Sequence, residues 1–301
     1  MDFNERAYLV PGRPTALGEE WPFGGWDPAS TVPSSEATWL YAQLSNNAYD
    51  QENRTGTLYD LGPAVTLLIC REDPYYGMDY AVFEVARDGQ PVETVIAYRG
   101  TQFTHWNDWW HGNFRGRQNL RGLAIYDFWR EHLGRSASIS VTGHSLGGGI
   151  ATHVSLNRPN VSSVVFNSSP VFWREGAGHD NPRRSVVENW EILALLRLPG
   201  DEPTQVWTEL GCTSGENAVD QHSISKLAHC LTLIAGYRSD EARASICRNN
   251  MVYPSSWRTR QPDCTTDLAY RPAAPLPRQS PPLPDDGSQP CRRSERGADG
   301  N

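Results

Sequence analysis

The sequence predicts an α/β domain with a mostly parallel central sheet flanked by helices. Short β-branched runs alternate with helical stretches along the chain, and short turns join them. The 301 residues are 38% hydrophobic and 21% charged, which excludes collagen-like, coiled-coil and wholly disordered chains. We place this domain at residues 1–270 and a disordered Pro-rich tail at 271–301. Two packed domains divided near residue 180 are the alternative, which the continuous strand–helix rhythm disfavours.

One helix and three strands are expected in the first third of the chain. The residues before 34 are rich in Pro, Gly and Trp and predict an irregular arm. Ser34 and Ser35 can cap a helix over residues 36–49. Each of the strands that follow is an apolar or β-branched run. The strands cover residues 64–70, 80–85 and 94–98.

The middle of the chain repeats the strand–helix rhythm. Leu123, Tyr126, Trp129 and Leu133 have helical spacing, whereas residues 137–141 alternate as a strand does. Seven prolines within the twenty residues from 271 and the lack of apolar periodicity predict the disordered tail. In chain order we expect helix 120–133, strand 137–141, helix 148–156, strands 161–166 and 186–188, and helix 223–235.

Charge, chain ends and cysteines limit the classes of function. A net charge of −8 gives no electrostatic footprint for nucleic acid. The first thirty residues contain no apolar run of signal-peptide length, and the apolar stretch 64–70 is too short to cross a bilayer. We therefore expect a cytoplasmic protein, with leaderless secretion as the alternative. The six cysteines form no C-x-x-C pair and are interpreted as free thiols, with disulfides as the alternative.

A single short motif carries chemistry. Gly143-His144-Ser145-Leu146-Gly147 lies directly between the expected strand 137–141 and the expected helix 148–156. In such a nucleophile elbow the serine is held on a strained turn, and the glycines leave room for the neighbouring strand and helix. The N-terminus of the helix favours the negative charge of a tetrahedral intermediate. The amide of Leu146 is expected to be one oxyanion donor.

Val141–Gly149 resembles the nucleophile elbow of the fungal-type triacylglycerol lipases (lipase class 3) and related bacterial phospholipases. Ala97–Thr101, about 45 residues upstream, resembles the strand and oxyanion loop of that family. The two matches lie in the family's order, and the resemblance extends over about residues 90–235. It implies the α/β-hydrolase fold, a Ser–acid–His triad that cleaves ester bonds of acyl lipids without a cofactor, and Thr101 as the second oxyanion donor.

The histidine of the triad is expected to follow both Ser145 and the acid in the chain. His153 lies two turns into the helix after the elbow and cannot fold back, and His179 comes too early for this order. His222 lies at a loop-to-helix junction from which an imidazole can reach the strand ends. We therefore predict His222 as the catalytic histidine and keep His229, two turns further along the helix, as the alternative.

The acid is expected just past a strand end, where it can orient the imidazole. Residues 188–193 fit the family's frame, with Glu191 in the place of the catalytic aspartate. This is a departure from the family pattern, because glutamate carries one more methylene. Asp201 and Glu188 remain the alternatives to Glu191.

A tryptophan cluster follows the expected oxyanion loop. Trp106, Trp109 and Trp110 have i, i+3, i+4 spacing, which on a helix makes one aromatic face. The resemblance implies a lid helix in this segment, and we expect residues 104–112 to meet lipid there; packing into the core is the alternative.

The sequence as a whole predicts a serine hydrolase that cleaves carboxylic esters of lipids, a lipase or phospholipase. Its expected partners are a lipid ester and, transiently, a membrane surface; we expect no metal or other cofactor, and the oligomeric state is not predicted. The alternatives are a soluble esterase or thioesterase acting on small acyl substrates, and a non-catalytic relative that binds a partner. An intact elbow argues against the last of these.

Overall fold

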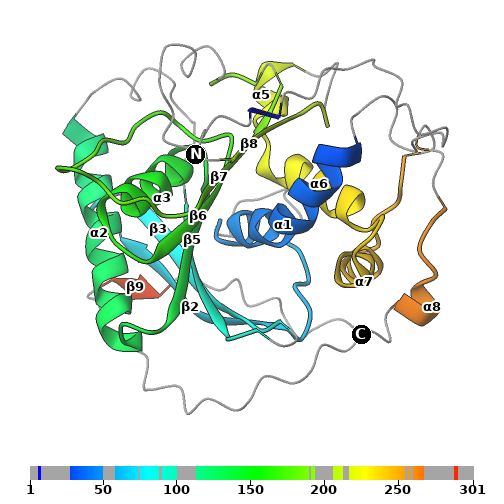
Figure 1. Cartoon of the computed structure of the whole chain (residues 1–301), viewed down its shortest axis with the longest axis horizontal. Helices are drawn as coiled ribbons and strands as arrows, with labels where there is room; N and C mark the ends of the chain where they lie inside the picture. Colours follow the sequence, from blue (N-terminus) through cyan, green and yellow to red (C-terminus); the bar gives the residue numbers. More distant parts are fainter. Residues whose placement is uncertain are drawn as a thin grey trace, which may run out of the picture.

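The computed structural model describes residues 6–7, 28–49, 58–73, 75–87, 90–99, 113–189, 191–193, 206–212, 217–254, 257, 260–267 and 288–290. Its centre is a nine-stranded sheet in the order β1-β8-β7-β6-β5-β4-β3-β2-β9 (Figure 1). The strands are β1 (Arg6–Ala7), β2 (Val65–Asp73), β3 (Met78–Val85), β4 (Glu93–Tyr98), β5 (Ser138–His144), β6 (Val161–Phe166), β7 (Arg183–Glu188), β8 (Val206–Leu210) and β9 (Gln289–Pro290).

Neighbouring strands are parallel from β4 through β5, β6, β7 and β8 to β1, and antiparallel at β4–β3, β3–β2 and β2–β9. The mostly parallel sheet expected from the sequence is therefore confirmed. Because parallel strands run the same way, the carboxyl ends of β4 to β8 meet at one edge of the sheet. We call this the carboxyl edge; β5 reaches it at His144 and β7 at Glu188.

Helices cover both faces of the sheet. They are α1 (Pro28–Asn47), α2 (Asn113–Leu133), α3 (Leu146–Asn157), α5 (Ala218–Gln221), α6 (Ile224–Ala235), α7 (Asp240–Arg248) and α8 (Cys264–Asp267). In Figure 1, α2 and α3 lie on one side of the sheet, and α1, α6 and α7 lie on the other. No helix in the described ranges is both long and apolar enough to cross a membrane.

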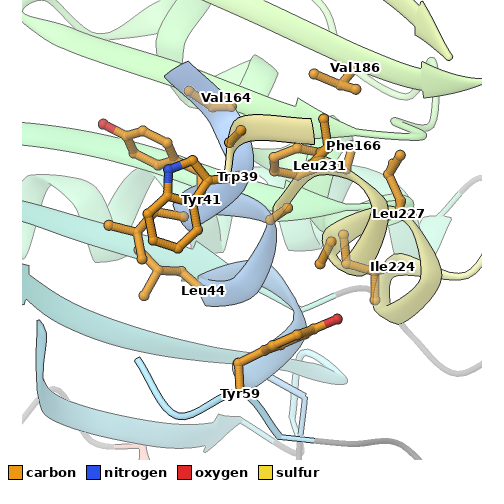
Figure 2. Close-up of a cluster of buried hydrophobic side chains, with 14 of the residues drawn as sticks. Trp39, Tyr41, Leu44, Tyr59, Val164, Phe166, Val186, Ile224, Leu227 and Leu231 are labelled. Carbon is orange, nitrogen blue, oxygen red and sulfur yellow. The ribbon is translucent and has the colours of Figure 1, made fainter. Parts of the chain in front are cut away.

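Alternating residues of the strands fill a separate core on each face. In β4, Val95 points to the core shared with α1 and α6, whereas Ile96 points to the core shared with α2 and α3. Figure 2 shows the first of these cores, where Trp39 and Leu44 of α1 gather with side chains of α6 and of the sheet. The two buried faces hold the central strands, and therefore the carboxyl edge, in a fixed position.

The helix expected over residues 36–49 begins earlier, at Pro28. Proline is compatible with a first helical position because its missing N–H needs no partner there. Ser34, expected as a cap, instead shares a 2.6 Å hydrogen bond with Thr208 of β8 through its hydroxyl. Val32 is fully buried in a cluster with Cys230 and Ile234. Packing against β8 and α6 thus extends the helix beyond its local start signal.

The tail expected to be disordered lies mostly outside the described residues. Within residues 271–301 the structure describes 288–290, and β9 there pairs with Arg71 and Glu72 of β2. The proposed division at residue 270 remains a prediction.

The expectation of free thiols is wrong. Cys212 is bonded to Cys230, and Cys247 to Cys264, with Cα–Cα distances of 5.9 and 5.3 Å. Cys70 is disulfide-bonded as well. The first bridge ties the residues just after β8 to α6, and the second joins α7 to α8. Sequence spacing alone cannot give such pairings, because they depend on which elements the fold brings together.

Removing the bridge between Cys212 and Cys230 is expected to destabilise the fold. The two residues are 18 apart in the chain, and a loop of this length constrains the unfolded state by about 3 kcal/mol. The Cys212→Ala/Cys230→Ala variant should lose about that much free energy of unfolding, measured by urea denaturation without reductant. With reductant present, the difference from the unsubstituted chain should largely disappear. An unchanged unfolding free energy without reductant would contradict the expectation.

Candidate active site

Ser145 lies at the carboxyl edge, between the last residue of β5 and the first residue of α3. Its φ of 57° and ψ of −124° are unusual for a residue with a side chain, and such a conformation costs about 1–3 kcal/mol. Two backbone hydrogen bonds hold the turn: the Ser145 N–H donates to the Phe166 carbonyl at 3.0 Å, and its carbonyl accepts from the Ser169 N–H at 2.9 Å. The strained elbow expected from the motif is therefore present.

The two motif glycines are required by close approach. A Cβ on Gly147 would lie 2.1 Å from the carbonyl oxygen of Tyr98 in β4. A Cβ on Gly143 would lie 2.4 Å from the Gly147 carbonyl carbon. Any side chain would therefore push α3 away from the sheet, and the helix N-terminus would leave the carboxyl edge. The backbone N–H of Leu146, at the first position of α3, belongs to the helix-end groups that have no partner within the helix.

His222 and Glu191 come together as a buried pair. His222 Nδ1 lies 2.5 Å from Glu191 Oε2, and the residues are 6% and 2% exposed. Glu191 Oε2 also accepts from the Leu193 N–H at 2.9 Å, which fixes the carboxylate. Because the carboxylate is the acceptor, Nδ1 carries the proton and the neutral ring has its acceptor nitrogen at Nε2. This is the tautomer that a general base facing a serine needs.

Short local signals position the pair. Glu191 lies three residues beyond β7, and its loop is held by the Ile192 N–H, which donates to the Ala218 carbonyl of α5 at 3.2 Å. Asn217 caps α5 through its side chain, and His222 follows the last residue of that helix. Ser223 then caps α6 by accepting from the Lys226 N–H. The histidine is thus held at the junction of two capped helices, whereas the sequence predicted a loop before a single helix.

His144 connects this pair to the elbow. Its Nε2 lies 2.6 Å from the backbone carbonyl oxygen of His222, and the two imidazole centroids are 4.6 Å apart. Ser145 itself is 1% exposed, and its Oγ has no hydrogen-bond partner among the described residues. Catalytic hydrogen bonds in unliganded enzymes are often long and tighten when substrate binds. The sequence motif places no requirement on residue 144, so sequence reasoning missed this contact.

The alternative candidates lie elsewhere or outside the described part of the chain. His229 is half-buried in α6, where burial lowers its pKa, and the hydrogen bonds of the described residues do not join it to Glu191 or Ser145. Glu188 is the buried last residue of β7, and its N–H donates to Asn167 Oδ1. Asp201, Thr101 and the tryptophan segment 104–112 lie outside the described residues.

No metal centre is built from the described residues, since no group of three or more His, Cys, Asp and Glu side chains is arranged to hold an ion there. The described residues combine a strained serine at a helix N-terminus with an imidazole oriented by a buried carboxylate, and His144 joins the two. Nucleophilic catalysis by serine requires a combination of this kind. These groups lie at the ends of parallel strands, where α/β sheets present their sites.

One family model matches part of the chain. Residues 40–175 match the family model of the phospholipase-like proteins, described as a Tle-like phospholipase domain. The match covers the C-terminal part of α1, the strands β2 to β6 and Ser145, and it ends before Glu191 and His222. The resemblance to lipases and phospholipases read from the two motifs is therefore confirmed. No curated protein matches the chain.

Several solved lipase structures are similar to part of the chain at low identity and low TM-score. The lipase from Rhizopus microsporus var. chinensis is 19% identical, with a TM-score of 0.38 over 57% of this chain and 71% of that one. A Rhizomucor miehei lipase propeptide complex is 18% identical, with a TM-score of 0.40 over 65% and 76% of the two chains. Lipase II from Rhizopus niveus is 17% identical, with a TM-score of 0.40 over 56% and 77%. Likeness at this level says nothing about substrate.

Proposed function

We propose that this chain, which carries a phospholipase-like domain over residues 40–175, is a serine hydrolase that cleaves carboxylic ester bonds of phospholipids. One observation carries the proposal: the buried 2.5 Å contact between His222 and Glu191 is joined through His144 to the turn that holds the strained Ser145. A pair of this kind is costly to bury. Orienting the imidazole for a nucleophilic serine would explain why the His222–Glu191 pair is buried.

The proposed reaction has two stages. In the first, Ser145 Oγ attacks the acyl carbonyl while His222 Nε2 takes the hydroxyl proton, and Glu191 stabilises the imidazolium. The imidazolium then returns the proton to the leaving alcohol oxygen, here the lysophospholipid, and the acyl group stays on Ser145. In the second, His222 removes a proton from water, the hydroxide attacks the acyl-enzyme, and the fatty acid leaves as Ser145 regains its proton.

The oxyanion of both tetrahedral intermediates needs donors that are already in place. We assign this role to the Leu146 N–H at the N-terminus of α3 and to the N–H of Thr101. Removing one such donor typically costs about 10²–10³ in rate. No cofactor enters either stage.

The proposal is tested with the pure protein on three substrates. These are vesicles of mixed phosphatidylethanolamine and phosphatidylglycerol, a triolein emulsion, and monomeric p-nitrophenyl butyrate. We expect lysophospholipid and free fatty acid from the vesicles, detected by mass spectrometry, and none from vesicles given the Ser145→Ala variant. Hydrolysis of triolein alone would make the protein a triacylglycerol lipase, and hydrolysis of the butyrate alone a soluble esterase. No hydrolysis of any ester would support a non-catalytic relative.

We also propose that the protein docks on a bilayer through an edge surface formed by Tyr75, Arg117, Leu120 and Trp173. Tyr75, Leu120 and Trp173 are 71%, 55% and 39% exposed. The Arg117 guanidinium lies 4.7 Å from the Tyr75 ring centroid. A Cβ on Gly116 would lie 3.8 Å from the Trp173 ring, so Trp173 packs on α2 one turn before Leu120. The four side chains therefore gather around the N-terminal half of α2.

This edge surface lies at the carboxyl edge of the sheet, as Ser145 does. Tyr75 precedes β3, which extends past the end of β4, since Tyr80 pairs with Tyr98. Trp173 lies in the segment that follows the carboxyl end of β6. Tyrosine and tryptophan are typical of the water–lipid boundary, and arginine pairs with phosphate. A phospholipid bilayer therefore fits the surface both in polarity and in charge.

The Leu120→Ser/Trp173→Ser variant is expected to bind phospholipid vesicles about tenfold more weakly. Each side chain inserted in full would contribute about 2 kcal/mol, and partial insertion leaves a fraction of that. Vesicle sedimentation measures binding, and p-nitrophenyl butyrate hydrolysis checks that the site is intact. Val252, which is 66% exposed outside the edge surface, supplies the matched control Val252→Ser. Equal vesicle binding by the double variant and the control would contradict the proposal that the edge surface docks on the bilayer.

We further propose that the protein works in an oxidising compartment. Structural disulfides persist in such compartments and are rare in the cytoplasm, and Cys212–Cys230 and Cys247–Cys264 are both bridged. These bridges favour the leaderless-secretion alternative over the cytoplasmic expectation. Fractionation of the native host, with thiol alkylation of the recovered protein, tests this: a cytoplasmic pool with reactive thiols would contradict it.

A further inference from the structure

The His144 side chain joins two described parts of the chain by hydrogen bonds. It is 5% exposed and lies between Tyr49, two residues after α1, and the loop that carries His222. Its Nδ1 lies 2.9 Å from the hydroxyl of Tyr49, and its Nε2 lies 2.6 Å from the backbone carbonyl oxygen of His222. A hydrogen-bond chain therefore runs from Tyr49 through His144 to the backbone of His222.

The direction of each hydrogen bond follows from the groups involved. A carbonyl oxygen only accepts, so His144 Nε2 carries a proton and donates it to the His222 carbonyl. The neutral ring then has an acceptor at Nδ1, which the Tyr49 hydroxyl fills as donor. The phenol thus selects the His144 tautomer that can hold the carbonyl. The His144 ring also lies 4.6 Å, centroid to centroid, from the His222 imidazole. Ring packing and the hydrogen bond therefore both restrict the position of His222.

We propose that His144 is a positioning residue that holds His222 at a fixed place relative to Ser145. Its side chain holds the backbone of His222, while its own backbone is adjacent to the nucleophile on the strained turn. Glu191 fixes the imidazole at Nδ1, but a ring held at one end can still pivot. Fixing the carbonyl of the same residue removes this freedom. The inference rests on the proposed function, since it assigns to His144 the alignment of that reaction's base.

The test compares two substitutions at one position on p-nitrophenyl butyrate. His144→Phe keeps the ring but loses the donor, whereas His144→Gln keeps a donor that can reach the carbonyl. Misplacing a catalytic group by about 1 Å can cost about 100-fold. His144→Phe should therefore lower kcat by about that factor with KM unchanged, and His144→Gln should recover most of the loss. Tyr49→Phe should show a smaller loss of kcat, because the tautomer is then no longer selected.

His153→Phe is the matched control. His153 is also a fully buried histidine, but it lies along α3 against Trp173, with ring centroids 4.4 Å apart. Its replacement should leave kcat on the monomeric ester unchanged. If His144→Phe loses no more kcat than His153→Phe, or if His144→Gln is no better than His144→Phe, His144 does not position the base.

A second measurement separates this inference from the proposed function. The proton shared by His222 Nδ1 and Glu191 is expected to give a low-field proton NMR signal that does not depend on turnover. The signal should stay sharp in His144→Gln and should shift or broaden in His144→Phe. If the unsubstituted protein hydrolyses no ester, the proposed function fails while this signal still decides whether His144 holds His222. An identical signal in both variants would overturn the inference.

Discussion

Ser145→Ala is expected to lose nearly all ester hydrolysis, a fall in kcat of about 10⁶ if chemistry limits the rate. The hydroxyl is the atom that forms the acyl-enzyme, and no other group can take its place on the elbow turn. The serine side chain is buried and its Oγ has no hydrogen-bond partner among the described residues. The substitution should therefore leave the fold intact. Kinetics on p-nitrophenyl butyrate, with a urea unfolding curve, measure both effects.

His222→Ala should cost about as much as Ser145→Ala, because nucleophile and base act as a unit. His229→Ala is the matched control, since His229 lies seven residues further along and is only half-buried. We expect that control to retain activity. If His222→Ala instead keeps more than about a tenth of the activity while His229→Ala does not, the assignment of the histidine is wrong.

Glu191→Gln is expected to lower kcat by about 10⁴, less than loss of the serine. Glutamine has almost the same shape and fills the buried site. However, it can turn an amide N–H₂ toward His222 Nδ1 and so stabilise the wrong imidazole tautomer. The 2.5 Å contact at Oε2 is the one that would be replaced. Kinetics on the monomeric ester measure the loss, and unfolding curves check the fold.

Glu188→Gln supplies the control for Glu191→Gln. Both glutamates are 2% exposed and lie at the same end of β7, so loss of a buried carboxylate is matched between them. Glu188→Gln should keep most of the activity. A crippled Glu188→Gln or Asp201→Asn, with an active Glu191→Gln, would show that the frame used to align the acid is wrong.

The local parts of the fold could be predicted from the sequence. Strand 161–166 forms β6 over the same residues, and the G-x-S-x-G motif forms the turn between β5 and α3. Both depend on short-range patterns: β-branched runs, and glycines where backbones approach closely. The contact of Glu191 with His222 agrees with the acid suggested by the family's frame, although the sequence left Asp201 and Glu188 open as alternatives.

The parts that depend on long-range packing could not be predicted. The sequence does not predict β8, because Val206–Leu210 is short and is held as a strand by pairing with β7 and β1. The early start of α1 depends on Thr208, far along the chain. The contact of His144 with Tyr49 joins residues 95 apart in sequence. Residue spacing in a single sequence cannot predict such contacts between distant parts of the chain.

The most direct test of the central claim is labelling with a fluorophosphonate, followed by peptide mass spectrometry. The probe reacts with a serine only where a base activates it and an oxyanion hole receives the phosphoryl oxygen. We predict one adduct per chain on Ser145, with no adduct at this position in Ser145→Ala and slowed labelling in His222→Ala and Glu191→Gln. An adduct on another serine, or no adduct from a chain that still hydrolyses esters, would contradict the account.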